Sequence, residues 1–129
     1  WGEGHIPPPP FYEECDRRGI LLWQDFMFGY GMHPAGDPDF DDNCKSEIED
    51  MIRRLRNHPS LLLWCGGNEN HMGWDFAFGS KPSVGTGLFR EVMPGACSRL
   101  DPGRLFHPSS PFGGRVPNWP CGRSPSPTT

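Results

Sequence analysis

The stretch that decides the fold is residues 61–74, which read LLLWCGGNENHMGW. Its first five residues form an apolar run between a Pro-Ser pair and a Gly-Gly pair. This pattern favours a short strand buried on both faces over a helix. Asn68 and Glu69 follow the glycines directly, so we expect them just past the carboxyl end of that strand. Because parallel α/β folds bind ligands and carry catalytic groups at this edge, Glu69 is the candidate reactive residue.

A predicted helix leads into this strand. Residues 43–56 carry apolar side chains at helical spacing, arginines gather in the last turn, and Pro59 ends the helix. The acidic segment 37–43 is expected to supply the N-cap. A helix, a short loop, a buried strand and a polar cluster in this order make half of a βαβ unit, which is typical of a β/α barrel.

The flanking segments repeat this order of elements. We expect parallel strands at residues 20–26, 61–66 and 105–107, and helices at 43–56 and 87–100. Pro94 and Gly95 are expected to break or kink the second helix. A short helix at 11–18 should end at Gly19, and Trp23 is expected in the core. The sequence therefore predicts the α/β fold class.

Composition and charge exclude several classes of function. The chain has 129 residues and a formal net charge of −4, and its basic side chains form no stripe, so nucleic-acid binding is not indicated. No apolar run reaches the roughly 20 residues of a membrane helix, so no membrane partner is expected. The 5 cysteines include no C-x-x-C pair and indicate buried, reduced thiols, not a zinc site or a disulfide framework. The acidic loop 27–43 lacks the spacing of a calcium loop, so no metal is expected.

Three separated blocks of the sequence resemble one enzyme family. Residues 56–69, which read RNHPSLLLWCGGNE, are similar to the acid/base segment of glycoside hydrolase family 2. Within that family, Trp64-Cys65 is most similar to the β-mannosidase branch. Residues 19–28 resemble the preceding barrel strand of these enzymes, and residues 100–112 resemble the following one. The likeness covers residues 1–114, with the blocks in the family's order.

The resemblance implies a partial (β/α)8 TIM barrel in residues 1–114. A complete barrel needs roughly 250 residues, so the chain would hold about three of the eight βα units and could not close a barrel alone. The rest of the barrel and accessory β-domains are then expected in the intact protein, whose compartment the sequence does not indicate. Residues 115–129 depart from the family, and we expect a disordered tail there, native or produced by a reading-frame error.

The resemblance also assigns catalytic roles. Cleavage of a glycosidic bond usually takes two carboxyl groups. Glu69 would be the general acid/base, and Asn68 would hold the sugar hydroxyl next to the anomeric carbon. The family's nucleophile is a second glutamate on a later strand, which residues 1–129 do not reach. The isolated chain is therefore expected to be inactive, and no cofactor is expected.

Four more residues are candidates for substrate binding. The resemblance places Trp1 in the pocket for the terminal sugar, where an aromatic face can stack on the pyranose ring. Trp74 is a second stacking candidate, and His71 is a candidate donor to a sugar hydroxyl. Asp25 lies at the end of a predicted strand. It is either a hydrogen-bond partner at the substrate site or a carboxylate that caps a loop.

The function implied by these blocks is that of a retaining exo-glycosidase. Its substrate would be an oligosaccharide or glycan from which it removes terminal β-D-mannosyl residues. A related family 2 specificity, such as β-glucosaminidase, β-galactosidase or β-glucuronidase, remains an alternative because these enzymes share the Asn-Glu pair. A truncated remnant that binds sugar without catalysis is the non-enzymatic alternative.

Overall fold

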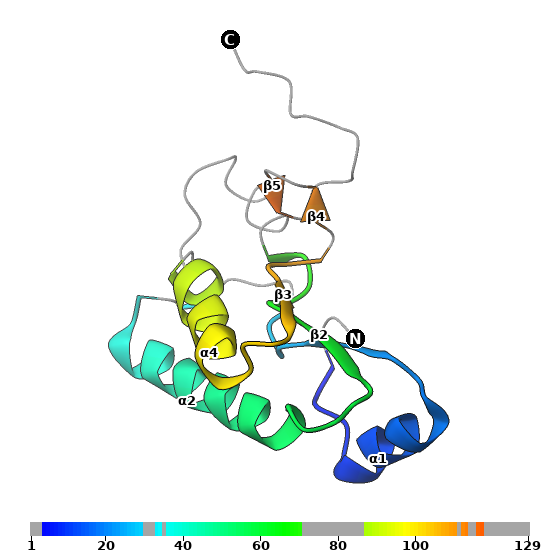
Figure 1. Ribbon diagram of the computed structural model, residues 1–129. Helices are drawn as coiled ribbons and strands as arrows, with labels where there is room; N and C mark the ends of the chain where they lie inside the picture. The colour runs from blue at the N-terminus through cyan, green and yellow to red at the C-terminus, as the bar shows by residue number, and fades with distance from the viewer. Residues whose placement is uncertain are drawn as a thin grey trace.

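The computed structural model describes residues 4–29, 33–34, 36–70 and 87–110, and the backbone of 112–113 and 116–117 (Figure 1). In chain order the elements are helix α1 (Pro9–Arg18), strand β1 (Leu22–Asp25), helix α2 (Pro38–Leu55), strand β2 (Leu61–Cys65), the π-helical turn η1 (Leu88–Val92), helix α4 (Met93–Leu100), and strands β3 (Leu105–His107), β4 (Phe112–Gly113) and β5 (Val116–Pro117). Each helix in the described part of the chain is too short or too polar to span a lipid bilayer.

Strands β1, β2 and β3 form a parallel sheet in that order. In its register Trp23 lies opposite Leu63, and Leu63 lies opposite Leu105. Both predicted parallel pairings are confirmed, and helices connect the successive strands as in βα units. The short strands β4 and β5 pair antiparallel beyond the sheet. The predicted domain end near residue 114 and the disordered tail stay predictions, since residues 118–129 lie outside the described part.

Helix α2 begins earlier than predicted because of its cap. Asp37 accepts hydrogen bonds from the backbone N–H groups of Asp39 and Phe40, and Pro38 occupies the first helical turn. A capped first turn with proline at its start forms without an apolar face, so the helix starts at Pro38 and not at residue 43. Its buried stripe confirms the predicted spacing. The stripe consists of Cys44, Ile48, Met51, Ile52 and Leu55.

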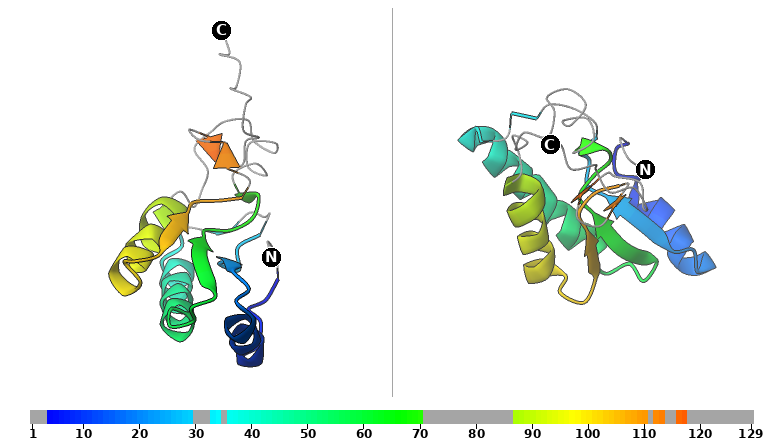
Figure 2. Two further views of the ribbon diagram at one scale, coloured as in Figure 1. Left: turned by 45° about the vertical axis from the view of Figure 1, so that its right-hand side comes forward. Right: turned by 90° about the horizontal axis from the view of Figure 1, so that it is seen from above.

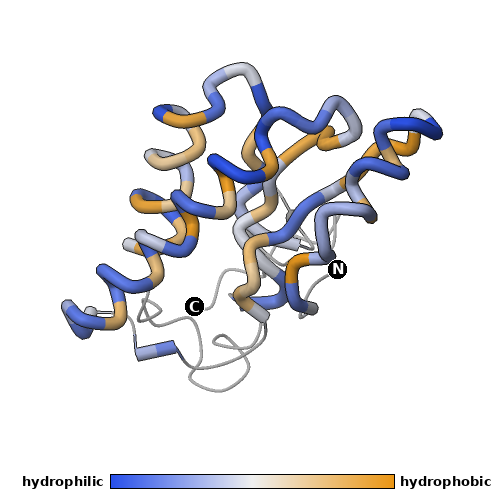
Figure 3. Tube along the Cα trace, turned by 90° about the horizontal axis from the view of Figure 1, so that it is seen from below, coloured by the Kyte–Doolittle hydropathy of each residue, from blue (hydrophilic) through white to orange (hydrophobic). Residues whose placement is uncertain are grey.

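Helices α2 and α4 lie side by side along one face of the three strands (Figure 2). Apolar segments recur along the helical turns in the hydropathy view (Figure 3), and the buried side chains there include Ile52, Met93 and Trp64. The Trp64 ring also stacks on Phe26, with ring centroids 5.3 Å apart. This layer between helices and sheet is the core of the described residues.

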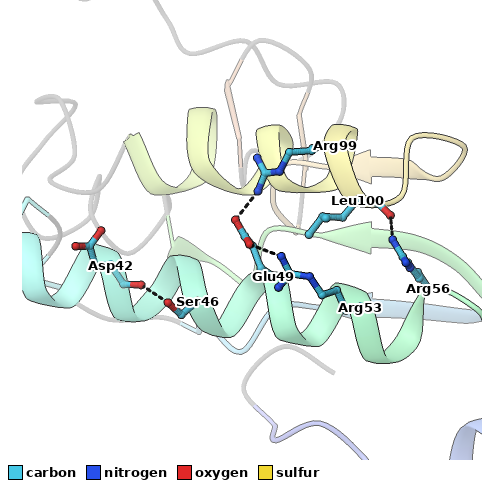
Figure 4. A network of polar contacts seen from close by, with 7 residues as sticks. All are labelled: Asp42, Ser46, Glu49, Arg53, Arg56, Arg99 and Leu100. Carbon is cyan, nitrogen blue, oxygen red and sulfur yellow. Dashed lines mark hydrogen bonds and ion pairs between the residues drawn. The ribbon is translucent and has the colours of Figure 1, made fainter.

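Polar contacts join α2 and α4 at the rim of this layer (Figure 4). Glu49 on α2 accepts hydrogen bonds from Arg53 on the same helix and from Arg99 on α4. The Arg56 guanidinium donates to the carbonyl of Leu100 at 2.8 Å. Arg56, at the C-cap of α2, therefore binds the last residue of α4 in addition to placing a positive charge at the end of its own helix.

The predicted helix at 87–100 is interrupted before Pro94. The Met93 N–H donates to the Leu88 carbonyl, five residues back, which makes residues 88–92 a π-helical turn. Proline has no N–H to donate, and its ring crowds the carbonyl four residues earlier, so a regular α-helix cannot run through it. Pro94 lies in the first turn of α4 instead, where its missing donor costs nothing.

The sheet face opposite the helices carries exposed apolar side chains. Gln24 turns toward the helices, where its Oε1 accepts a hydrogen bond from Tyr12 of α1 at 2.7 Å. Alternation along a strand then places Trp23 and Asp25 on the other face. Trp23 is 45% exposed there and Leu105 is 71% exposed, so Trp23 lies outside the core that the described residues form between helices and sheet. In a closed barrel this face is the interior.

Candidate active site

Glu69 lies beyond the carboxyl end of β2, at the predicted edge of the sheet. The strand ends at Cys65, and Gly66 and Gly67 lead from it to Asn68. The ends of β1 and β3 meet the same edge, because all three strands run parallel. Groups from three consecutive βα units therefore converge around Glu69, as catalytic groups do in β/α barrels.

Backbone hydrogen bonds attach residues 66–70, called the Glu69 loop below, to the segments that follow β1 and β3. On the β1 side, the Asn68 N–H donates to the Phe28 carbonyl at 3.0 Å. On the β3 side, the Glu69 N–H donates to the Ser110 carbonyl at 2.7 Å, and the Ser110 N–H donates to the Gly67 carbonyl at 3.0 Å. Asn68 and Ser110 form an isolated parallel bridge. Main-chain groups thus hold the loop from two sides, and these bonds involve no side-chain atoms.

The two glycines before Asn68 allow these close approaches. A Cβ on Gly66 would lie 2.2 Å from the carbonyl oxygen of Pro108, and a Cβ on Gly67 would lie 2.2 Å from that of Phe28. Gly67 also has φ +142°, where side chains are rarely accommodated. The Gly-Gly pair is therefore what lets the loops after β1 and β3 close on the end of β2.

Glu69 itself has a left-handed backbone, with φ +53°. This conformation costs a residue with a side chain about 1–2 kcal/mol, so the surrounding hydrogen bonds must maintain it. Strained backbone of this kind collects at functional sites, where a side chain has to point in one direction. The Glu69 side chain is partly exposed at the sheet edge.

A side chain that we did not single out from the sequence reinforces the loop. Asn70 is 7% exposed, and its Nδ2 donates to the Phe28 carbonyl at 2.9 Å. Its Oδ1 lies 3.3 Å from Nε2 of His33. Only the position of Asn70 directly after Glu69 could have drawn attention to it.

Asp25 is a buried carboxylate at the end of β1. It is 4% exposed, and its Oδ1 accepts a hydrogen bond from Nε1 of Trp23 at 2.7 Å. Cys65 lies opposite Asp25 in the sheet. Burial, together with the negative charge of Asp25, raises the pKa of the Cys65 thiol to about 12, so this thiol stays protonated. Asp25 therefore fixes the Trp23 indole on the open face, and a contact of Asp25 with substrate stays a prediction.

The remaining predicted site residues, Trp1, His71 and Trp74, lie outside the described residues and stay predictions. The described cysteines are free and buried; they are Cys15, Cys44, Cys65 and Cys97. Within the described ranges, no three His, Cys, Asp or Glu side chains come close enough together to hold a metal ion.

Comparisons with known proteins agree with this arrangement. The chain is similar to beta-mannosidase B of Thermothelomyces thermophilus, at 33% identity over 126 residues, which is 88% of this chain and 15% of that protein. It is also similar to the beta-mannosidase of Bos taurus, at 44% identity over 86 residues, 64% of this chain and 9% of that protein. A crystal structure of a beta-D-mannosidase from Dictyoglomus thermophilum matches 92% of this chain and 15% of that chain, with a TM-score of 0.81 and 44% identity.

These similarities cover a small part of each relative, since the chain spans about 15% of the length of the fungal and bacterial proteins. The model of one family, described as glycosyl hydrolases family 2, TIM barrel domain, matches residues 8–110. That range includes β1, β2, β3 and the Glu69 loop. The chain therefore belongs to glycosyl hydrolase family 2, as part of its TIM barrel domain.

Proposed function

We propose that this segment is part of the catalytic barrel of a retaining exo-glycosidase that hydrolyses terminal β-D-mannosyl residues of oligosaccharides, with Glu69 as general acid/base. The observation that carries the proposal is the left-handed Glu69 residue, bound through its backbone to Ser110 at the carboxyl edge of a parallel sheet. A carboxyl group fixed at this edge is suited to proton transfer at a bound ligand.

In the proposed reaction Glu69 protonates the glycosidic oxygen as the bond to the anomeric carbon breaks. A second carboxylate attacks that carbon, and Glu69, now ionised, takes a proton from the water that releases the sugar. Asn68 binds the hydroxyl next to the anomeric carbon, a contact that strengthens as positive charge develops on the ring. The second carboxylate belongs to a later strand of the barrel, so residues 1–129 alone are expected to be inactive.

The proposed sugar is mannose because two of the matching blocks resemble the β-mannosidase branch and the similar proteins carry that name. In the terminal-sugar pocket we assign Trp1 and Trp74 to stacking on the pyranose ring and His71 to a hydroxyl. Asp25 is assigned to the same pocket as a hydrogen-bond partner at the substrate site, with its Oδ1 bound to the Trp23 indole.

The test is the substitution Glu69→Gln in a complete enzyme that contains these residues. General acid catalysis typically contributes about 100- to 10,000-fold, and it matters most when the leaving group is poor. We expect kcat/KM to fall by at least about 100-fold for an alkyl or sugar leaving group and far less for an activated aryl β-mannoside. Glu13→Gln, on the exposed side of α1, is the matched control and should leave both rates unchanged. Equal losses on both substrates would mean that Glu69 has another role.

A further inference from the structure

The Asn70 side chain links the Glu69 loop to the segment that follows β1. It is buried, and both ends of its amide are engaged, with Nδ2 at 2.9 Å from the Phe28 carbonyl and Oδ1 at 3.3 Å from Nε2 of His33. This buried amide holds one orientation, since turning it over would place its oxygen against the Phe28 carbonyl oxygen, and two acceptors cannot pair.

The neighbours of this amide determine where the protons lie. The Phe28 carbonyl can only accept, so the nitrogen of Asn70 faces it and the oxygen faces His33. The His33 Nε2 must then donate to that oxygen, and a second acceptor, the Gly29 carbonyl, lies 3.2 Å from the same nitrogen. The contacts of His33 therefore place a proton on its Nε2.

Aromatic rings hold His33 in this position. The Phe28 ring meets it edge-on with centroids 5.6 Å apart, and the Phe40 ring stacks on it at 6.4 Å. Phe89 of η1 lies 6.4 Å away on a tilted plane. The imidazole thus contacts aromatic rings from the segment after β1, from α2 and from η1, in addition to Asn70.

The bonds of Asn70 act on Glu69 through the backbone. Asn68 and Asn70 flank Glu69 in sequence, and both donate to the single carbonyl oxygen of Phe28. The Glu69 N–H meanwhile donates in the other direction, to Ser110. A turn attached on both sides of its left-handed residue cannot relax to an ordinary backbone, and the Cβ direction of Glu69 is set by that backbone.

We propose that Asn70, oriented by His33, is a positioning residue that aims the Glu69 carboxyl group at the leaving oxygen; this rests on the proposed role of Glu69. A general acid must lie within hydrogen-bond reach of the atom it protonates, and a displacement of about 1 Å can lower the rate about 100-fold. Asn70 itself does not contact the substrate in this proposal. Its loss should therefore reproduce, in weaker form, the loss of the acid.

The experiment compares three variants of a complete enzyme that contains these residues. Asn70→Ala removes both bonds of the amide. His33→Phe keeps an aromatic ring and the bond from Asn70 to Phe28, but it removes the Nε2 donor that faces Oδ1 and the Gly29 carbonyl. Tyr12→Phe is the control. Tyr12→Phe deletes a buried hydrogen bond of similar length, which the Tyr12 hydroxyl donates to Gln24 on the helix-facing side of β1. For each variant kcat/KM is measured on an activated aryl β-mannoside and on one with a poor leaving group.

Asn70→Ala should reduce the rate on the poor leaving group at least about 10-fold more than the rate on the activated one. His33→Phe should shift this ratio in the same direction by less, and it tests the proposal even where Asn70→Ala does not fold. Tyr12→Phe should leave the ratio unchanged. An unchanged ratio in Asn70→Ala or His33→Phe, where Glu69→Gln changes it, overturns the positioning role alone. An unchanged ratio in all of these variants overturns the role of Glu69 as well.

Discussion

Replacing Gly67 by alanine tests the packing on which the Glu69 loop depends. The new Cβ would lie 2.2 Å from the Phe28 carbonyl oxygen and 2.5 Å from Nδ2 of Asn70. The first of these atoms is main chain, so the clash can be relieved only by moving the loop after β1 away from β2. That movement breaks the hydrogen bonds that Asn68 and Asn70 donate to Phe28.

The expected magnitude follows from these contacts. Each broken hydrogen bond costs about 1 kcal/mol net, and more where a buried group is left unpaired. A side chain at the positive φ of Gly67 adds roughly 1–2 kcal/mol of backbone strain. The free energy of unfolding should therefore fall by about 3–5 kcal/mol, which is beyond the range of an ordinary surface substitution.

Gly95→Ala is the matched control for this experiment. Gly95 lies in α4 without a positive φ, and a methyl group added there would have open space within 4 Å. The same substitution there should raise stability by about 0.5–1 kcal/mol, since alanine is the better helix former. Both variants are compared by chemical denaturation of the complete protein, together with kcat/KM on an aryl β-mannoside. If Gly67→Ala is as well tolerated as Gly95→Ala, the close approach of the Phe28 carbonyl does not constrain the loop.

Two further substitutions test the contacts that helix α1 makes with the rest of the fold. Burial alone would raise the pKa of Asp16, but hydrogen bonds from Ser60 and His58 outweigh burial and lower this pKa to about 2. The ionised Asp16 therefore stabilises the folded protein fully above the pKa of about 4 that it has in the unfolded chain, and this contribution is lost as pH falls toward 2. At neutral pH the denaturation midpoint of the wild type should be higher than that of Asp16→Asn, and the difference between the two midpoints should shrink below pH about 4. A difference that stays constant with pH would contradict this. Tyr12→Phe leaves Gln24 Oε1 without its buried donor and should lower the free energy of unfolding by about 1–3 kcal/mol, so an unaltered midpoint would show that the bond contributes little.

The strands and the place of Glu69 could be predicted because local signals agree there. The run at 61–65 is apolar, short and bounded by proline and glycine, and the polar Asn-Glu pair follows at once. The start of α2 could not be read from its apolar stripe, since its first turn is polar and depends on the Asp37 cap. Which strand residue faces the helices could not be read from β1 alone, because polar Gln24 occupies that face and is paired there by the Tyr12 hydroxyl of α1.

The support of the site lay beyond sequence reasoning for a different reason. The Phe28 and Ser110 carbonyls that hold the Glu69 loop are main-chain groups, which every residue has, so no residue type marks them. The Gly-Gly pair was visible as a strand terminator, but its tolerance of close carbonyls appears only once the three strands are assembled. Asn70 likewise acquires its two partners only through the fold.

The Phe28 carbonyl has a consequence for how this site can vary. No amino-acid replacement at position 28 deletes a main-chain oxygen, so two hydrogen bonds of the Glu69 loop persist through any side-chain change there that leaves the backbone path intact. The path is instead sensitive to spacing, because Phe28 lies three residues past the end of β1. One inserted or deleted residue between them would present a different carbonyl, or none, to Asn68 and Asn70. The geometry of Glu69 therefore depends on the number of residues between β1 and Phe28 more than on which residues they are.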